Sequence, residues 1–288
     1  IVRIHEVGAD TEHTLPYIVM DLLSGADLAD TVRQLGPLPP EVAARLFLQA
    51  CAGLASAHAQ SFVHRDVKPA NLFLHREPNG QVVVKVCDFG IAKDSDEGES
   101  ITRTGGMLGS PMYMSPEQAT ASNTIDHRPD VWSLGASLYH ALSGSPPWEG
   151  LESAGELILA VCTKPVPDLH ERAPWVAGEL VDAVRACMRK NPDERLGSME
   201  ELAARLRDFV GATDEVRLSE LRRVGRRTMA SSAPLRVVSV EPDTDASGVA
   251  STIFEPAKPR ARWPWAVAAA VAVGGLACAW QLSRSPTP

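Results

Sequence analysis

The spacing of apolar residues along the first 210 positions predicts a domain built from helices and short strands. Residues 1–7 and 17–20 are short segments that we interpret as strands. After Pro39 and Pro40, apolar residues recur every three or four positions, which indicates a helix that ends near Ser61. Its apolar positions are Val42, Leu46, Ala50, Leu54 and Ala57.

A β-hairpin and a long helix are predicted farther along the chain. Residues 72–74 and 82–86 are apolar, and a Pro-Asn-Gly turn at 78–80 separates them. A second helix begins after Pro129 and ends at Gly144. Its stripe is Val131, Leu134, Leu138 and Leu142, and further helices are expected over 153–162, 176–189 and 199–210. We therefore expect an α+β domain with a core that extends to about residue 210.

The last part of the chain has a different pattern. Residues 263–282 contain no charged side chain, and as a helix they would span about 30 Å, the thickness of a bilayer core. We predict a transmembrane helix there, with a buried helix of a soluble domain as the alternative. Tryptophans lie where interfacial aromatic residues are expected, at Trp263, Trp265 and Trp280. Three cations before the helix against one after it predict that the preceding domain is cytoplasmic. These cations are Lys258, Arg260 and Arg262 before it and Arg284 after it.

Residues 212–262 read as a linker between the folded domain and this helix. The first part is rich in arginine, as at Arg222, Arg223, Arg226 and Arg227, and Ser/Pro/Asp-rich sequence follows. The basic stretch either contacts anionic lipid headgroups or is an ordinary solvated run of charge. After the predicted helix, residues 283–288 form a short tail.

Composition fits a cytoplasmic globular region attached to a segment of another kind. The chain has 288 residues, of which 44% are hydrophobic, and a net charge of −8. No basic patch indicates a nucleic-acid partner. The five cysteines lack the spacing of metal ligands, so we expect reduced thiols in apolar surroundings. They are Cys51, Cys87, Cys162, Cys187 and Cys278.

Two short signatures carry the candidate chemistry. Residues 64–71 read His-Arg-Asp-Val-Lys-Pro-Ala-Asn, and residues 88–90 read Asp-Phe-Gly. They supply two carboxylates, an amide and a lysine, which suit the alignment of a nucleophile and the stabilisation of phosphate charge. Each signature alone is a weak signal. Here they are followed in order by Ser-Pro-Glu at 115–117, by Asp-Val-Trp-Ser-Leu-Gly at 130–135 and by Arg195.

This ordered set resembles the protein kinase family, specifically its bacterial serine/threonine branch. The resemblance covers residues 1 to about 210 and implies a protein-kinase-like fold that uses ATP and Mg²⁺. It implies that Asp66 accepts the proton of the attacking hydroxyl and that Lys68 meets the charge on the phosphoryl oxygens. Asn71 and Asp88 would be the protein ligands of Mg²⁺ and so contact the nucleotide site.

The resemblance also assigns supporting roles to five residues. His64 and Arg65 would be structural, and Arg65 would meet a phosphorylated residue of the activation loop. Asp130 would hold the backbone of the catalytic loop. Glu117 would pair with Arg195 in a buried ion pair beneath the substrate-binding surface.

The activation loop would lie between Asp88 and Glu117. We predict Thr102 and Thr104 as autophosphorylation sites, because they stand where the family carries its activating phosphate; the alternative is that they are ordinary loop threonines. Ser110 would position the substrate through a hydroxyl that touches the catalytic aspartate and lysine. Autophosphorylation would bring two copies of the chain together, so self-association is an expected interaction.

Four residues resemble the nucleotide pocket of the family. Met20 matches the gatekeeper, and the backbone near Asp21 and Leu23 would hydrogen-bond adenine. Phe73 would form the apolar floor under the base. A purely structural core role is the alternative for the apolar members of this set.

The resemblance begins inside the small lobe of a kinase, because residues 1–7 resemble its fourth strand. The Gly-rich loop, the lysine of the third strand and the glutamate helix would all lie upstream. We interpret 1–24 as a remnant of the small lobe and hinge, and 25–211 as the large lobe. Loss of one preorganised electrostatic donor lowers a rate by about 10²–10³-fold. Because residues 1–288 contain none of these three upstream elements, we expect this chain alone to transfer phosphate slowly.

The sequence therefore predicts the fragment of a serine/threonine protein kinase, held in the cell membrane by one span at 263–282 with a cytoplasmic kinase region. Its partners would be proteins with Ser or Thr acceptors. The alternative function is a catalytically inactive, kinase-like module for docking or regulation.

Overall fold

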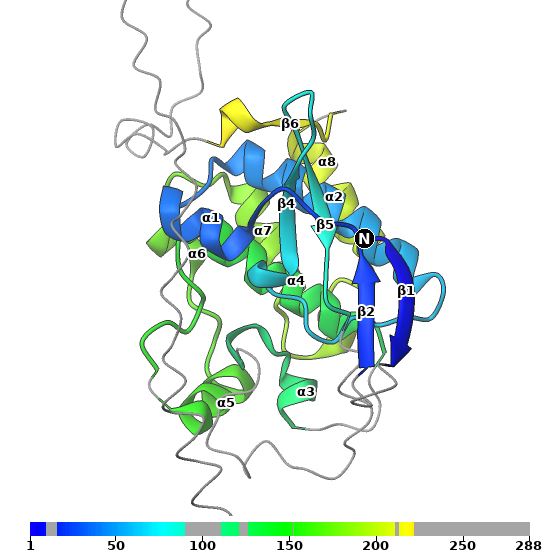
Figure 1. Ribbon diagram of the computed structural model, residues 1–288. Helices are drawn as coiled ribbons and strands as arrows, with labels where there is room; N and C mark the ends of the chain where they lie inside the picture. The colour runs from blue at the N-terminus through cyan, green and yellow to red at the C-terminus, as the bar shows by residue number, and fades with distance from the viewer. Residues whose placement is uncertain (10–15, 90–110, 121–125, 152, 211–212, 222–288) are drawn as a thin grey trace, which may run out of the picture. The chain divides into compact units, whose positions relative to one another are not determined.

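The computed structural model describes residues 1–9, 16–89, 111–120, 126–151, 153–210 and 213–221 (Figure 1). All of them belong to one unit, Ile1–Leu235, whereas the second unit, Arg236–Pro288, lies outside the described residues. The predicted transmembrane helix at 263–282, the tail at 283–288 and most of the predicted linker also lie outside them. Among the helices that the structure describes, none combines the length and the apolar character needed to cross a bilayer.

Two antiparallel sheets contain the strands of this unit. Strands β1 (Ile4–Ala9) and β2 (Pro16–Met20) form a two-stranded sheet. A four-stranded sheet has the order β3-β4-β5-β6. Its strands are β3 (Gly25–Asp27), β4 (Leu72–Arg76), β5 (Gln81–Val86) and β6 (Val216–Arg217). The β4–β5 pair is the hairpin that the sequence predicted, with its turn at 77–80.

Helices make up most of the rest of the described chain. They are α1 (Leu28–Leu35), α2 (Pro40–His58), α3 (Pro116–Ala119), α4 (Arg128–Ser143), α5 (Ala154–Thr163), α6 (Leu169–Arg172), α7 (Gly178–Cys187) and α8 (Met199–Val210). Short 3₁₀ turns occur at Pro69–Asn71, Pro111–Tyr113, Pro192–Glu194 and Leu218–Glu220. The predicted helices therefore form, whereas α1, the short α3 and α6 and the strands β3 and β6 were not predicted.

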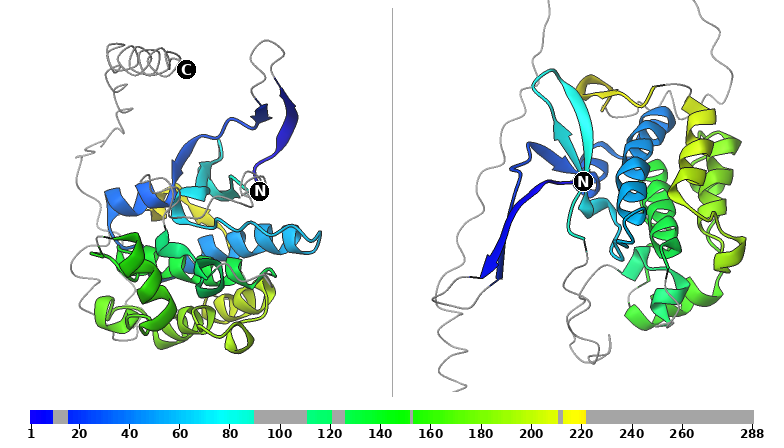
Figure 2. Two further views of the ribbon diagram at one scale, coloured as in Figure 1. Left: turned by 90° about the horizontal axis from the view of Figure 1, so that it is seen from below. Right: turned by 90° about the vertical axis from the view of Figure 1, so that its right-hand side faces the viewer.

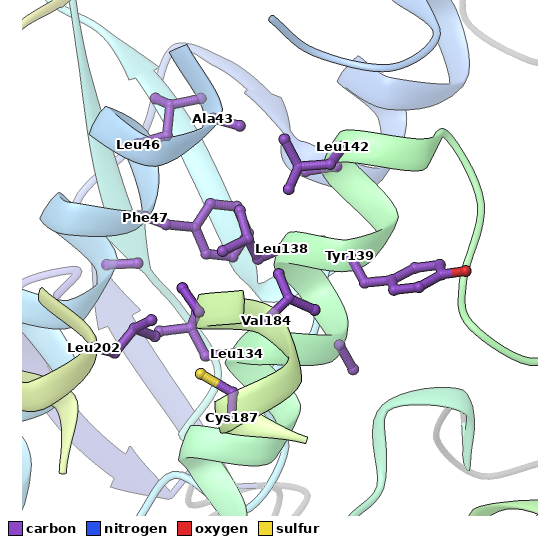
Figure 3. Packing of buried hydrophobic residues seen from close by; sticks show 14 of the residues in the cluster. Ala43, Leu46, Phe47, Leu134, Leu138, Tyr139, Leu142, Val184, Cys187 and Leu202 are labelled. Atoms are coloured by element: carbon purple, nitrogen blue, oxygen red, sulfur yellow. The ribbon is translucent and has the colours of Figure 1, made fainter. Parts of the chain in front are cut away.

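The core lies between α2, α4 and the helices that follow them. All five apolar positions predicted for α2 and all four predicted for α4 are buried. Figure 3 shows Phe47 of α2 pointing toward Leu138 of α4, with Val184 and Leu202 of α7 and α8 nearby. Helix α4 is buried on nearly every side, which identifies it as the central helix of this unit. It ends at Gly144, whose φ of 86° closes the last turn.

The four-stranded sheet covers one side of these helices. In β5 the buried residues Val82, Val84 and Val86 alternate with half-buried ones, as expected for a strand with one face on a core. The right-hand view of Figure 2 shows the β4–β5 hairpin on one side of α2, with α4, α7 and α8 on the other. The sheet thus holds the ends of β4 and β5 beside the loop that follows α2.

The β1–β2 hairpin exposes apolar side chains on both of its strands. Val7 is 68% exposed, and Tyr17, Ile18 and Val19 are each more than 40% exposed. Just before β1, the Val2 N–H donates to the Val86 carbonyl of β5 over 3.0 Å. This hairpin contributes little to the core of the described unit.

The folded domain continues past the boundary at residue 211 that the sequence suggested. Residues 213–221, which we had assigned to the linker, add β6 to the edge of β5 and bury Val216 completely. Arg45 of α2 forms a salt bridge with Glu220, and Gln49 donates to the Asp214 carbonyl over 2.7 Å. Local sequence patterns do not predict that residues 213–221 fold, because the contacts of this segment are with residues far away in the chain.

Candidate active site

The first signature forms a tight loop between α2 and β4. Pro69–Asn71 is a 3₁₀ turn that leads directly into β4, and it brings the side chains on either side of Pro69 close to Asp66. Lys68 Nζ lies 2.8 Å from Asp66 Oδ2, and Asn71 donates through Nδ2 to the Asp66 carbonyl over 2.9 Å and to Oδ2 over 3.3 Å. The structure therefore brings Asp66, Lys68 and Asn71 into direct contact, as the signature suggested.

The second signature joins the same place through the β4–β5 pairing. The Cys87 N–H donates to the Asn71 carbonyl over 2.9 Å, and His64 Nε2 lies 2.9 Å from the Cys87 carbonyl oxygen. The rings of His64 and Phe89 are 4.5 Å apart between centroids. Asp88 lies in the chain between Cys87 and Phe89, both of which contact His64, and its own side chain is exposed. Its φ of 54° is uncommon for an aspartate and is typical of residues held in place by their surroundings.

The Asp130 carboxylate holds the backbone at the start of the loop that contains the first signature, residues 64–71. It accepts hydrogen bonds from the His64 and Arg65 N–H groups, each over 2.8 Å. Arg65 has a φ of 61°, so this brace supports a backbone conformation that is strained for a side chain of its size. Gln118 of α3 donates to the Arg65 carbonyl over 2.8 Å. The role that the resemblance implied for Asp130 therefore has a direct structural counterpart.

Two members of this arrangement, His58 and Gln118, were not predicted from the sequence. His58, the last residue of α2, places Nε2 2.8 Å from Asp130 Oδ2. Gln118 closes the capping box of α3 with Ser115, and that Ser-x-x-Gln spacing is a feature that a search for helix starts could have found. His58 offers no such local pattern, because its partner lies 72 residues away.

Glu117 and Arg195 form the predicted ion pair below this site. Arg195 donates through Nη1 to Glu117 Oε1 over 2.6 Å and through Nη2 to Oε2 over 3.0 Å. The Arg195 side chain is fully buried and also lies over the ring of Trp132, 5.2 Å from its centroid. Because the Arg195 guanidinium is buried and makes two hydrogen bonds to the partly buried Glu117 carboxylate, the pair fixes α3 to the helical core.

The residues expected around adenine lie at the end of β2 and on β4. Met20 is 40% exposed, so a purely structural core role does not fit it. The Asp21 N–H already donates to the Arg3 carbonyl over 3.0 Å, and the Asp21 carboxylate lies 2.7 Å from His5 Nε2. Leu23 is partly exposed, and Phe73 is half-buried on the face of β4 opposite Leu72 and Leu74. These positions leave Met20, Leu23 and Phe73 accessible to a ligand.

The thiol beside Asp88 is not a candidate nucleophile. Burial raises the pKa of the Cys87 thiol, and the Asp88 carboxylate adds to the effect. The protonated form therefore prevails at neutral pH, and a thiol in that form is inert. Burial also raises the pKa of the Cys187 thiol to about 12, which agrees with reduced cysteines in apolar surroundings.

Three predicted residues lie outside the described residues. They are Thr102 and Thr104, the proposed phosphorylation sites, and Ser110, the proposed substrate-positioning residue. Residue 111, which follows them, begins the 3₁₀ turn that leads to α3.

The donor set suits Mg²⁺ bound together with a nucleotide. Within the described part of the chain, no three or more His, Cys, Asp or Glu side chains gather as a metal cluster. The site instead offers the Asp88 carboxylate and the Asn71 amide oxygen, since Asn71 uses its Nδ2 to bind Asp66. Mg²⁺ typically takes one or two such protein ligands and completes its shell with phosphates and water.

Comparison with known proteins gives matches over the same part of the chain. Residues 1–206 match the family model described as "Protein kinase domain". Serine/threonine-protein kinase PknB of Mycolicibacterium smegmatis is 40% identical over 209 residues, and PknB of Mycobacterium leprae is 38% identical over 208 residues. Each alignment covers 72% of this chain and 32% of the relative, so the chain matches about a third of the length of these relatives.

A solved structure also shares the fold. The crystal structure of Rad53 1-466 in complex with AMP-PNP superposes with a TM-score of 0.60 at 23% sequence identity. The match covers 73% of this chain and 50% of that chain. At this level of identity the likeness concerns the fold alone.

Proposed function

The chain belongs to the protein kinase domain family, and from that premise we propose that it carries the catalytic residues of a serine/threonine protein kinase. The proposed reaction moves the γ-phosphoryl group of Mg-ATP to Ser or Thr hydroxyls of protein substrates. The observation that carries this proposal is the contact of Asp66 with Lys68 and Asn71, next to Asp88. The names of the relatives, which are serine/threonine-protein kinases, support the same substrate class.

Each of these residues has one task in the proposed reaction. Asp66 orients the acceptor hydroxyl and takes its proton, and the Lys68 ammonium 2.8 Å from Asp66 stabilises negative charge on the transferred group. Asn71 and Asp88 would hold Mg²⁺, which supplies charge neutralisation for the phosphates when it is bound. Met20, Leu23 and Phe73 would surround the adenine base.

Replacement of the proposed base provides the first test. We expect Asp66→Asn to lower the rate of phosphate transfer from ATP by at least about 10²-fold, because a positioned base is worth about 10²–10⁴ in rate. The assay uses the longest version of the protein that its gene encodes, with a generic Ser/Thr substrate protein. The matched control is Asp182→Asn, an exposed aspartate on α7.

Two outcomes would contradict the proposal. Equal transfer by wild type and Asp66→Asn would remove Asp66 from the reaction. A wild type that binds Mg-ATP but transfers no phosphate would favour the inactive docking or regulatory module, the alternative function.

We also propose that the protein is regulated through its activation loop and held at the membrane. Thr102 and Thr104 would receive phosphate, which Arg65 would bind. Mass spectrometry after incubation with Mg-ATP tests this, since an active kinase without phosphate on either threonine excludes regulation through these two sites.

The uncharged stretch 263–282 supports a single membrane span with a cytoplasmic kinase region. A chain ending at residue 262 should then leave the membrane fraction, and retention there would contradict the span.

A further inference from the structure

A groove of about 480 Å³ lies on the helical side of the domain, and none of its lining residues belongs to the proposed catalytic site. Buried apolar side chains of α7 and its C-terminal end form the floor, among them Val181, Val184 and Met188. The Pro-Val-Pro segment at 165–167 forms one wall. Tyr139 of α4 reaches the groove from the core side.

The Tyr139 hydroxyl is a buried donor that makes no hydrogen bond with any described residue. Tyr139 is completely buried, and burial raises the pKa of its hydroxyl, so it remains a neutral donor. Figure 3 shows its ring leaving α4 on the side away from Phe47 and Leu134, with the oxygen at its tip. An unsatisfied buried hydroxyl costs about 1–3 kcal/mol, which an acceptor placed in the groove would recover.

The rim of the groove carries more positive than negative charge. Arg185 is neutralised by Asp182 at 2.6 Å and lies 3.9 Å from Asp168. Lys190 instead donates to the Val161 carbonyl over 2.7 Å, at the end of α5, and has no carboxylate partner among the described residues. Arg189 is exposed and forms no ion pair with a described residue.

The remaining polar lining residues, Asn191 and Glu194, are 3.3 Å apart, with the Asn191 amide donating to the Glu194 carboxylate. Arg189 and Lys190 therefore provide two cations without a carboxylate partner at the edge of an apolar floor. Such a surface is complementary to an apolar group next to a carboxylate.

The rim is also held rigidly by the buried ion pair. Arg195 donates to the Arg189 carbonyl over 3.0 Å and to the Lys190 carbonyl over 3.4 Å, while the same guanidinium binds Glu117. The backbone below the two rim cations is therefore fixed before any ligand arrives. Preorganisation of this kind lowers the entropic cost of binding.

We propose that this groove is a docking site for an extended peptide segment of a protein substrate, in which an apolar side chain precedes an acidic one. The apolar side chain would contact Val184 and Met188, and a peptide carbonyl would accept the Tyr139 hydroxyl. The acidic side chain would pair with Arg189 and Lys190. The inference rests on the proposed function only in naming the partner as a substrate.

Direct peptide binding tests the site without any phosphate transfer. The probes are a panel of fluorescein-labelled decapeptides with two central apolar residues followed by two acidic ones, and a matched panel with lysines in place of the acids. Fluorescence anisotropy with the full chain, in the absence of ATP, should show binding to acidic members of the panel. We expect the lysine versions to bind at least about tenfold more weakly, because the loss of one hydrogen bond between charged groups changes affinity by about that factor.

Two variants identify the groove as the binding site. Arg189→Gln and Tyr139→Phe should each weaken binding about three- to tenfold, because they remove one cation or one hydroxyl and leave the rest in place. Arg205→Gln, an exposed arginine of α8 outside the groove, is the control and should bind as wild type does. Circular dichroism confirms that each variant is folded.

Several outcomes would overturn the inference. They are no binding by any acidic peptide, equal binding of both panels, or binding that neither variant changes. Binding of laurate in the absence of peptide binding would assign the groove to a small carboxylate and likewise exclude a peptide site.

The outcome for the docking site is separable from the outcome for phosphate transfer. Asp66→Asn should bind the acidic peptides as wild type does. If transfer occurs, Arg189→Gln should raise KM for a substrate that contains the docking segment and leave kcat unchanged. The same variant should leave KM unchanged for a substrate without that segment.

Discussion

The Asp130 carboxylate shows how a single residue organises the candidate active site. It binds the His64 and Arg65 N–H groups and lies 2.8 Å from His58, so three separate groups depend on one side chain. The family resemblance implied that Asp130 holds this backbone. The contact of Asp130 with His58 depends on the packing of α2 against α4, which brings together residues 72 positions apart.

A buried charge pair gives a clear prediction at the residue scale. We expect Glu117→Gln to lower the free energy of unfolding by about 3 kcal/mol, because it leaves the fully buried Arg195 without a counter-charge. Urea denaturation measures the change. The control is Glu194→Gln, an exposed carboxylate, which should change stability by less than about 0.5 kcal/mol. Equal effects of the two substitutions would show that the pair contributes little.

His140 gives a prediction about pH. Its Nδ1 lies 2.7 Å from the Tyr113 hydroxyl, and burial holds the pKa of His140 below its ordinary value, with a smaller opposite effect from Glu149. The unfolded chain therefore binds a proton near pH 6.5 that the folded chain does not bind. The stability that His140 contributes is complete above about pH 6.5 and falls as the pH drops from there toward the lower, folded-state pKa.

Comparison with a variant isolates this contribution from other titrating groups. Between about pH 7.5 and pH 5, wild type should lose more unfolding free energy than His140→Gln, which cannot titrate in that range. Urea denaturation at both pH values gives the difference. An identical loss in the two proteins would mean that His140 is equally protonated in the folded and unfolded states.

At the scale of elements, the β4–β5 hairpin connects the two signatures. Its first strand begins after Asn71 and its second ends before Asp88, so the hairpin pairing decides where both stand. Gln49 of α2 supports β5 by accepting the Val84 N–H over 2.8 Å and donating to the Asp214 carbonyl. The hairpin is therefore held from two sides, by α2 and by the segment 213–221.

The segment 213–221 should be required for full stability. A chain that ends at Val210 loses the completely buried Val216, worth about 1.5–3 kcal/mol, and the contacts of Arg45 and Gln49 with this segment. We expect its unfolding free energy to be at least about 2 kcal/mol below that of a chain ending at Leu221. Thermal and urea denaturation measure this difference. Equal stability of the two chains would show that β6 adds nothing to the fold.

At the scale of the whole molecule, the β1–β2 hairpin leaves an apolar surface uncovered. Val7 is 68% exposed on β1, and Leu22, just after β2, is 98% exposed. Exposed apolar strands are surfaces on which other chains assemble. We expect the chain to self-associate at micromolar concentrations, as exposed strand edges commonly do.

A charge on this strand should reduce the association. Val7→Lys should shift the protein toward the monomer in light scattering after size-exclusion chromatography, because lysine on a strand protects it from pairing. Leu159→Lys, at a 58% exposed position on α5, is the control and should leave the distribution unchanged. A monomeric wild type, or equal effects of the two lysines, would contradict the prediction.

Local patterns were sufficient for the elements with strong periodicity. The apolar spacing in α2 and α4 and the turn between β4 and β5 fixed these elements closely, because each depends on neighbours within a few residues. The short α1 and β3 were missed, since eight and three residues carry too weak a pattern. The ion pair of Glu117 with Arg195 was reached only through the family resemblance.

By itself, the sequence determined the order of the long helices and the β4–β5 hairpin, and it led us to predict Asp66, Lys68, Asn71 and Asp88 as residues of one site. Only the tertiary structure decided the placement of His58 on Asp130, the addition of β6 and the groove beside Tyr139. The reason is physical: Arg45 and Glu220 meet across 175 residues of chain, and such contacts arise from packing of the whole domain. No local periodicity or spacing records them.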